Sequence, residues 1–173
     1  VTELDLITFI DPFKEDGNPQ SGLLKGVEDY GDKSIGQGDD YTQAYNFRYS
    51  TTSDPAHRAA IEAPDNYQAA DYELVGRYVS KLKADKTATK NSIGRQLADI
   101  MPMWDLSTNY RRDSLITMAP LGVSRLFADG DYATQAKIWK QHQDYLRGLY
   151  HFMTTDPRIP EKFREKLASQ GLN

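Results

Sequence analysis

The sequence of 173 residues contains no cysteine. A chain without thiols forms no disulfide, offers no thiolate nucleophile and binds no cysteine-ligated zinc. Its three histidines, at positions 57, 142 and 151, form no His-x-x-x-His pair, so the usual spacing of zinc ligands is also missing. We therefore expect no metal site.

Several catalytic motifs are also lacking. The sequence has no Gly-x-Ser-x-Gly elbow and no P-loop, and no carboxylate pair stands out among its 25 acidic residues. The stretch "GQGDDY" around Gly36 and Gly38 lacks the third glycine of a dinucleotide fingerprint, and its two carboxylates would repel a phosphate. We interpret it as a solvated turn, and the motifs indicate neither self-contained hydrolysis nor phosphoryl transfer.

Charge and hydropathy exclude two classes of partner. The net charge is -4 and the pI is near 5.4, whereas proteins that bind nucleic-acid backbones concentrate Lys and Arg on one face. No apolar run approaches the roughly 20 residues that span a bilayer, and the first residues lack the basic-then-apolar pattern of a signal peptide. We expect a soluble chain that binds neither nucleic acid nor membrane, and its compartment stays open. Because it begins with Val1, we expect a processed product or a piece of a longer protein.

The patterns predict one region of α+β class, with a predominantly helical C-terminal half, short strands and long loops. Residues 1–60 form the loop and strand part, with strands predicted over 3–10 and 41–51, and a long loop after residue 10. Residues 61–173 form the mainly helical part. One helix is predicted to start at an Asp71 N-cap, and a short closing helix is predicted between Pro160 and Gly171.

The strongest helix signal lies between about Tyr132 and Thr155. Its apolar stripe at helical spacing is too apolar to face solvent. The stripe comprises Ile138, His142, Tyr145, Leu149, Phe152 and Met153, widened by Trp139, Leu146 and Tyr150. We interpret His142 as a hydrogen-bonded core residue rather than as a base or a ligand.

The segment 41–51 alternates between two kinds of side chain. Tyr45 and its neighbours at every second position form an aromatic face, which we expect to be buried. The opposite face carries Asn46 and Arg48, whose side chains point the same way in a strand and could hold one polar ligand or one buried carboxylate. The alternative is an ordinary half-exposed strand with a polar face.

Three stretches together resemble the C-terminal part of a family of FAD-dependent oxidoreductases. The first is "SGLLKGV" followed by "GQGDDYTQAYNFRYSTT", and the second is "APDNYQAADYELVGRYV" with its Pro-x-x-Tyr helix start. The third is the closing block "DYATQAKIWKQHQDYLRGLYHFMTTDPRIPEKFREKLASQGL". The resemblance spans most of residues 19–172. The segment "DLSTNYRRDS" departs from the family's pattern, and only Asn109 corresponds to it, weakly.

The resemblance implies a piece of a larger flavoprotein fold. The chain would be the substrate-side or flavin-covering portion of an FAD-dependent oxidoreductase, inactive alone, because the Rossmann-type domain that holds most of the FAD in the family is absent from this sequence. It implies catalytic roles for Arg48 and Asn46, and contacts to the cofactor from Gln43, Tyr45 and Asn109. Arg48 would stabilise a reduced flavin or an electron-rich substrate, and Asn46 would orient it. The partners implied are a small organic substrate and the remainder of the enzyme or another chain.

A second hypothesis needs no cofactor. Eleven tyrosines and two tryptophans suit a non-catalytic helical module that binds a protein or a carbohydrate, because aromatic side chains are favoured contact residues. If the chain belongs to a larger enzyme, its domain interface should be apolar, and the isolated chain would then associate through it.

Overall fold

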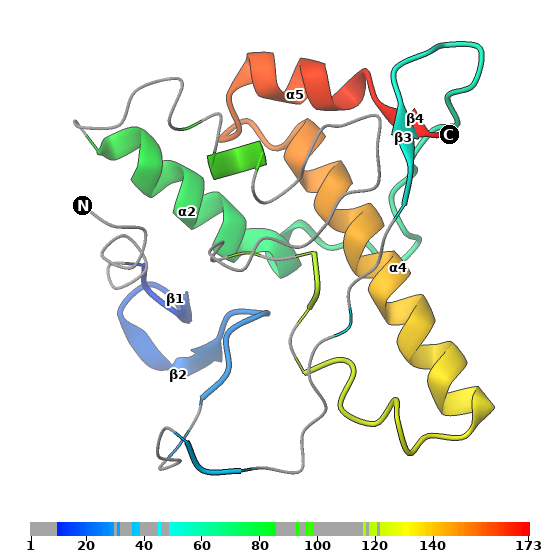
Figure 1. Ribbon diagram of the computed structural model, residues 1–173. Coiled ribbons are helices and arrows are strands. Elements are labelled where there is room, and N and C mark those ends of the chain that lie inside the picture. The colour runs from blue at the N-terminus through cyan, green and yellow to red at the C-terminus, as the bar shows by residue number, and fades with distance from the viewer. Residues whose placement is uncertain are drawn as a thin grey trace.

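The computed structural model describes residues 10–29, 31, 36–38, 45, 49–85, 93, 96–98, 116, 118–120 and 122–173. Its elements are, in chain order, β1 (Phe13–Glu15), β2 (Asn18–Leu23), β3 (Thr51–Thr52), the 3₁₀ turn η1 (Ala69–Tyr72), α2 (Glu73–Ala84), α4 (Tyr132–Thr155), α5 (Glu161–Ala168) and β4 (Gly171–Leu172). The strands form two antiparallel pairs, β1–β2 and β3–β4 (Figure 1). The predicted α+β class with a helical C-terminal half is confirmed.

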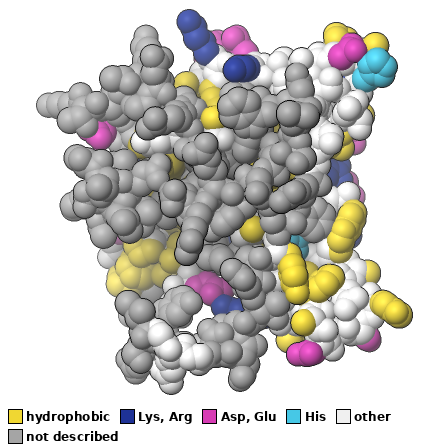
Figure 2. All heavy atoms as spheres, in the orientation of Figure 1, with side chains coloured by type: hydrophobic (Ala, Val, Ile, Leu, Met, Phe, Trp, Pro, Cys, Tyr) yellow, Lys and Arg dark blue, Asp and Glu magenta, His cyan; other side chains and the backbone are white. Residues whose placement is uncertain are grey.

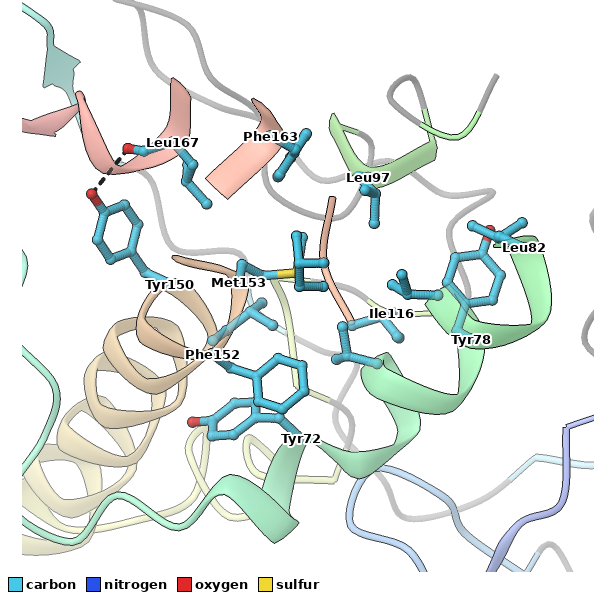
Figure 3. Packing of buried hydrophobic residues seen from close by; sticks show 14 residues of the cluster. Tyr72, Tyr78, Leu82, Leu97, Ile116, Tyr150, Phe152, Met153, Phe163 and Leu167 are labelled. Carbon is cyan, nitrogen blue, oxygen red and sulfur yellow. Dashed lines mark hydrogen bonds between the residues drawn. The ribbon is translucent and has the colours of Figure 1, made fainter. Parts of the chain in front are cut away.

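The hydrophobic core lies where α2, α4 and α5 meet (Figure 3). Leu82 of α2, Phe152 of α4 and Leu167 of α5 are each at most 2% exposed. Leu97, from the stretch 96–98 that is also helical, is fully buried against the same cluster. Each fully buried side chain of this size contributes about 1.5–3 kcal/mol, so this junction holds the helices together.

Helix α4 has the bounds that its sequence pattern predicts. Asp131 caps it, since its carboxylate accepts a hydrogen bond of 2.8 Å from the backbone N–H of Thr134. The predicted stripe is buried along most of the helix, with Leu149 and Met153 fully buried. Trp139 was wrongly assigned to the stripe, because it is 52% exposed on the outer side of the helix.

Two predicted helix boundaries were wrong. Asp71 lies inside η1 and binds Lys25, while Tyr72 occupies the N-cap position of α2. At the other end of the chain, Pro160 precedes α5 as predicted. Gly171 does not end that helix, because it belongs to β4, which pairs with β3.

The N-terminal part differs from its prediction in two places. The loop predicted after residue 10 contains the hairpin β1–β2, which turns at Asp16 and Gly17, and Gly17 has a φ of 71° that favours glycine. Tyr45, Tyr49 and Ser50 are not in a strand, so the prediction over 41–51 was wrong at these positions, and strand pairing begins only at Thr51. The strand predicted over 3–10 lies outside the described residues except for Ile10, which forms a bend.

Arg158 connects α4 and α5 to α2. Its guanidinium donates to both carboxylate oxygens of Glu73 at 3.0 and 2.9 Å and to both oxygens of Asp156 at 3.0 Å. It also lies 5.5 Å from the ring centroid of Phe152. Gly76 leaves room for it, because a Cβ there would meet the Arg158 Cζ at 2.0 Å.

Candidate functional site

A pocket of about 310 Å³ lies between the start of α2, the middle of α4 and the segments around residues 25 and 120. Its size is at the lower end of the range for small-molecule sites. The aliphatic part of the lining is Pro64, Leu74, Val75, Ile116, Pro120 and Val123. The polar and aromatic part is Lys25, Asn66, Tyr67, Gln68, Asp71, Tyr72, Gln141, Asp144 and Tyr145, with Gly26 completing the wall. An apolar interior with a few convergent polar groups is typical of a binding site.

Three tyrosines form one wall of the pocket. The ring of Tyr72 stacks on Tyr67 at 5.8 Å and on Tyr145 at 6.0 Å, measured between ring centroids. Burial raises the pKa of each of the three hydroxyl groups above its ordinary value. All three phenols therefore stay protonated and neutral at physiological pH.

Gly148 lets this wall form against α4. The hydroxyl of Tyr72 donates to the backbone oxygen of Tyr145 at 3.0 Å. A Cβ on Gly148 would meet the same hydroxyl oxygen at 2.0 Å, so a larger residue there would displace the Tyr72 ring.

Two side chains of α4, Arg147 and His151, hold the segment before η1 against this helix. The guanidinium of Arg147 donates to the backbone oxygens of Glu62 at 2.8 Å and Ala63 at 3.3 Å. The ring of Tyr67 meets the ring of His151 edge-on at 4.6 Å. These contacts fix Pro64 and Tyr67, the two named residues of the Pro-x-x-Tyr stretch, at the pocket.

The charges around the pocket are paired. The ammonium of Lys25 binds the Asp71 carboxylate at 2.6 Å. Asp144 accepts two bonds of 2.9 Å from Lys140, one turn earlier on α4. Among the lining residues of the described chain, Lys25 is the single basic one. The pocket therefore offers little attraction to a free anion.

Tyr45 is the predicted site residue that the structure describes. Its backbone N–H donates to the hydroxyl of Ser124 at 3.3 Å, and its ring lies 5.0 Å from that of Phe127. Ser124 follows Val123, which lines the pocket. Tyr45 is thus held next to a neighbour of the pocket lining, and its side chain is 42% exposed rather than buried as predicted.

Ser124 is itself fixed by a buried histidine. His142 is 1% exposed, its Nδ1 lies 2.9 Å from the backbone oxygen of Ile138, and its Nε2 lies 3.4 Å from the Ser124 hydroxyl. The backbone oxygen of Ile138 can only accept a hydrogen bond, so the imidazole carries its proton on Nδ1. The Nε2 atom therefore accepts a hydrogen bond from the Ser124 hydroxyl. This confirms His142 as a hydrogen-bonded core residue.

Four of the predicted site residues lie outside the described residues: Gln43, Asn46, Arg48 and Asn109. At the end of the motif, burial and the nearby Tyr150 raise the pKa of Tyr49 to about 12. Tyr49 is therefore partly buried, whereas Tyr45 is 42% exposed.

The pocket could not be predicted from the sequence, because its lining residues are far apart in the chain. Tyr145 was predicted only as a core residue, and Tyr72 was not singled out. The Pro-x-x-Tyr stretch was the one signal that pointed there.

In the described part of the chain, no group of three or more acidic or histidine side chains is arranged to hold a metal ion. Nor does a helix among the described residues have the length and apolarity needed to cross a bilayer. No protein-family model, curated protein or solved structure matches the sequence.

Proposed function

We propose that this chain is the substrate-side portion of an FAD-dependent oxidoreductase whose cofactor is held mainly by another domain or chain. The bound flavin would supply hydride transfer to or from a small organic substrate. The tyrosine-walled pocket would bind that substrate, and the motif attached at Tyr45 would lie between substrate and flavin.

One observation carries this proposal: all the stretches that resemble the family contribute to the pocket or adjoin it. Lys25 and Gly26 come from the first stretch, Tyr67 and Tyr72 from the second, and Tyr145 from the closing block. Tyr45, from the "QAYNFR" part of the first stretch, bonds to Ser124, the residue after the pocket-lining Val123. These stretches are spread over more than half of the sequence, and in this proposal they share one role, the binding of the substrate.

The pocket fits a substrate better than it fits the cofactor. FAD carries a pyrophosphate, which proteins usually hold with a glycine-rich turn at a helix N-terminus. The pocket has no such turn among its described residues, and its Lys25 is already paired with Asp71. We therefore assign no part of FAD to this pocket.

The first test is the visible absorption spectrum of the complete reading frame that contains this chain, after purification. Flavin bands are expected, and a colourless protein would contradict the proposal. In the coloured protein, Arg48→Ala is expected to lower turnover or flavin affinity by about tenfold or more, because a cationic group near developing negative charge is lost. Unchanged turnover and affinity would remove Arg48 from the site.

A second function is favoured by a separate observation. Hydrophobic side chains gather on the surface over the N-terminal half of α4 (Figure 2). There, Tyr132 is 90% exposed and Trp139 is 52% exposed, with Leu126 at 69% on the preceding turn. Such a surface suits a non-catalytic module that binds a protein partner. A colourless complete protein would make this the leading function.

A further inference from the structure

The mouth of the pocket carries side chains that both donate and accept hydrogen bonds. Asn66, Gln68 and Gln141 line it, and within the described part of the chain their amide groups bind no other side chain or backbone group. An amide offers donors on its nitrogen and lone pairs on its oxygen. A hydroxyl group on a ligand has the same dual character, so these amides match hydroxyls better than they match purely accepting groups.

The pocket's electrostatics exclude a strongly charged ligand. Asp71 and Asp144 are neutralised by Lys25 and Lys140 respectively. An anion would find no unpaired cation among the described lining residues, and a cation would compete with two existing ion pairs. A neutral ligand loses the least solvation free energy on entering the pocket, because burying a charge without a partner is costly.

The interior offers apolar contact on several sides. Val75 is 2% exposed and Ile116 is 5% exposed, and both line the pocket with the tyrosine wall. The ring of Tyr67 belongs to that wall and stacks on the ring of Tyr72. A sugar ring combines the two properties required, since it has an apolar face of C–H groups and hydroxyls around its edge.

We propose that the pocket binds a neutral sugar ring, with its hydroxyls on Asn66, Gln68 and Gln141 and its apolar face against the tyrosine and aliphatic wall. This rests on the proposed function only in naming the ring as the substrate, because the binding itself needs no flavin.

Saturation-transfer NMR on the 173-residue chain tests the proposal. The probes are the methyl glycosides of glucose, galactose, mannose and xylose, with glucuronate as the anionic probe and benzyl alcohol as the apolar one. At least one neutral glycoside is expected to receive saturation, and more strongly than glucuronate or benzyl alcohol. Binding by glucuronate or benzyl alcohol alone, or by no probe, would overturn the proposal.

Two variants localise the binding. Gln68→Ala and Gln141→Ala are each expected to weaken the affinity for the bound glycoside by roughly fivefold, the effect of one hydrogen bond. Gln143→Ala is the matched control, since Gln143 lies on the same helix but does not line the pocket. Circular dichroism checks that all three variants fold. Equal affinities in the three variants would place the sugar elsewhere and contradict the assignment.

The experiments can reject sugar binding and flavin binding independently of each other. A yellow complete protein without sugar binding would leave the oxidoreductase and reject the substrate class. A colourless complete protein whose chain binds the glycoside through Gln141 would reject the oxidoreductase and keep the sugar pocket.

Discussion

Two glycines in helices make room for side chains that bind across the core. Gly76 faces the guanidinium of Arg158, and Gly148 faces the hydroxyl of Tyr72. Glycine in a helix is normally worse than alanine by about 1 kcal/mol, so its presence at these two contacts costs stability locally. The contacts they permit, to Glu73 and Asp156 in one case and to the Tyr145 backbone in the other, give the reason.

Gly76→Ala is expected to lower the free energy of unfolding by about 1–3 kcal/mol, although the change improves helix propensity. The new methyl group would overlap with the Arg158 guanidinium and break its ion pair with Glu73. Chemical denaturation measures the difference. The double variant Gly76→Ala with Arg158→Ala is the control, in which the alanine at 76 should no longer be harmful. A single variant more stable than the parent would refute this contact.

Asp156 makes stability depend on acid pH. Burial raises its pKa, but the stronger combined effect of its hydrogen bonds with the Arg158 side chain and backbone holds the pKa below the ordinary 3.8. A carboxylate with a lowered folded-state pKa stabilises the protein above its unfolded-state pKa, and this contribution is lost as pH falls through the folded-state value.

We therefore expect the stability of the chain to fall as the pH drops below about 4, and to fall less in Asp156→Asn. Denaturation midpoints across this acid range measure both slopes. The asparagine keeps one oxygen that can accept from the Arg158 backbone N–H but loses the second acceptor, so the comparison of slopes rather than of absolute stabilities reports the titrating charge. Identical slopes would show that Asp156 does not contribute to acid unfolding.

At the scale of elements, the long helix could be predicted and the short strands could not. The stripe of α4 runs for 24 residues, so its period is unmistakable, and its bounds agree with the structure. The hairpin β1–β2 has strands of three and six residues, which are too short for a clear alternation of polar and apolar side chains. Its Asp-Gly turn is the feature of the sequence from which it could have been predicted. Trp139 was misassigned because a stripe seen in sequence has no sharp edge.

The N-cap of α4 provides a test of how this helix is fixed. Asp131→Ala is expected to lower the free energy of unfolding by about 1 kcal/mol, because the backbone N–H of Thr134 loses its acceptor. Asp129→Ala, two residues earlier and outside the helix, is the matched control for the loss of one negative charge. Thermal unfolding of both variants measures the effect. If both lose the same stability, charge rather than capping is responsible.

For the molecule as a whole, the sequence predicted the helical C-terminal half but not the pocket. The pocket is lined by residues as far apart in the sequence as 25, 67, 123 and 145, and the segment that carries Tyr67 is held against α4 by Arg147 and His151. Contacts between residues so far apart leave no local sequence pattern from which the pocket could be predicted. The stretches that resemble the oxidoreductase family contribute residues to this pocket, and the proposed function rests on that observation.

We propose that this pocket adjoins a flavin, and a fluorescence measurement tests the proposal without knowledge of the substrate. Tryptophan close to a flavin quenches its fluorescence, so we would compare the flavin fluorescence lifetime in the complete protein carrying Gln141→Trp at the pocket with that carrying Lys162→Trp on the outer side of α5. The account predicts a clearly shortened lifetime for Gln141→Trp and an unchanged one for Lys162→Trp. Equal lifetimes in the two variants, or a protein without flavin, would contradict it.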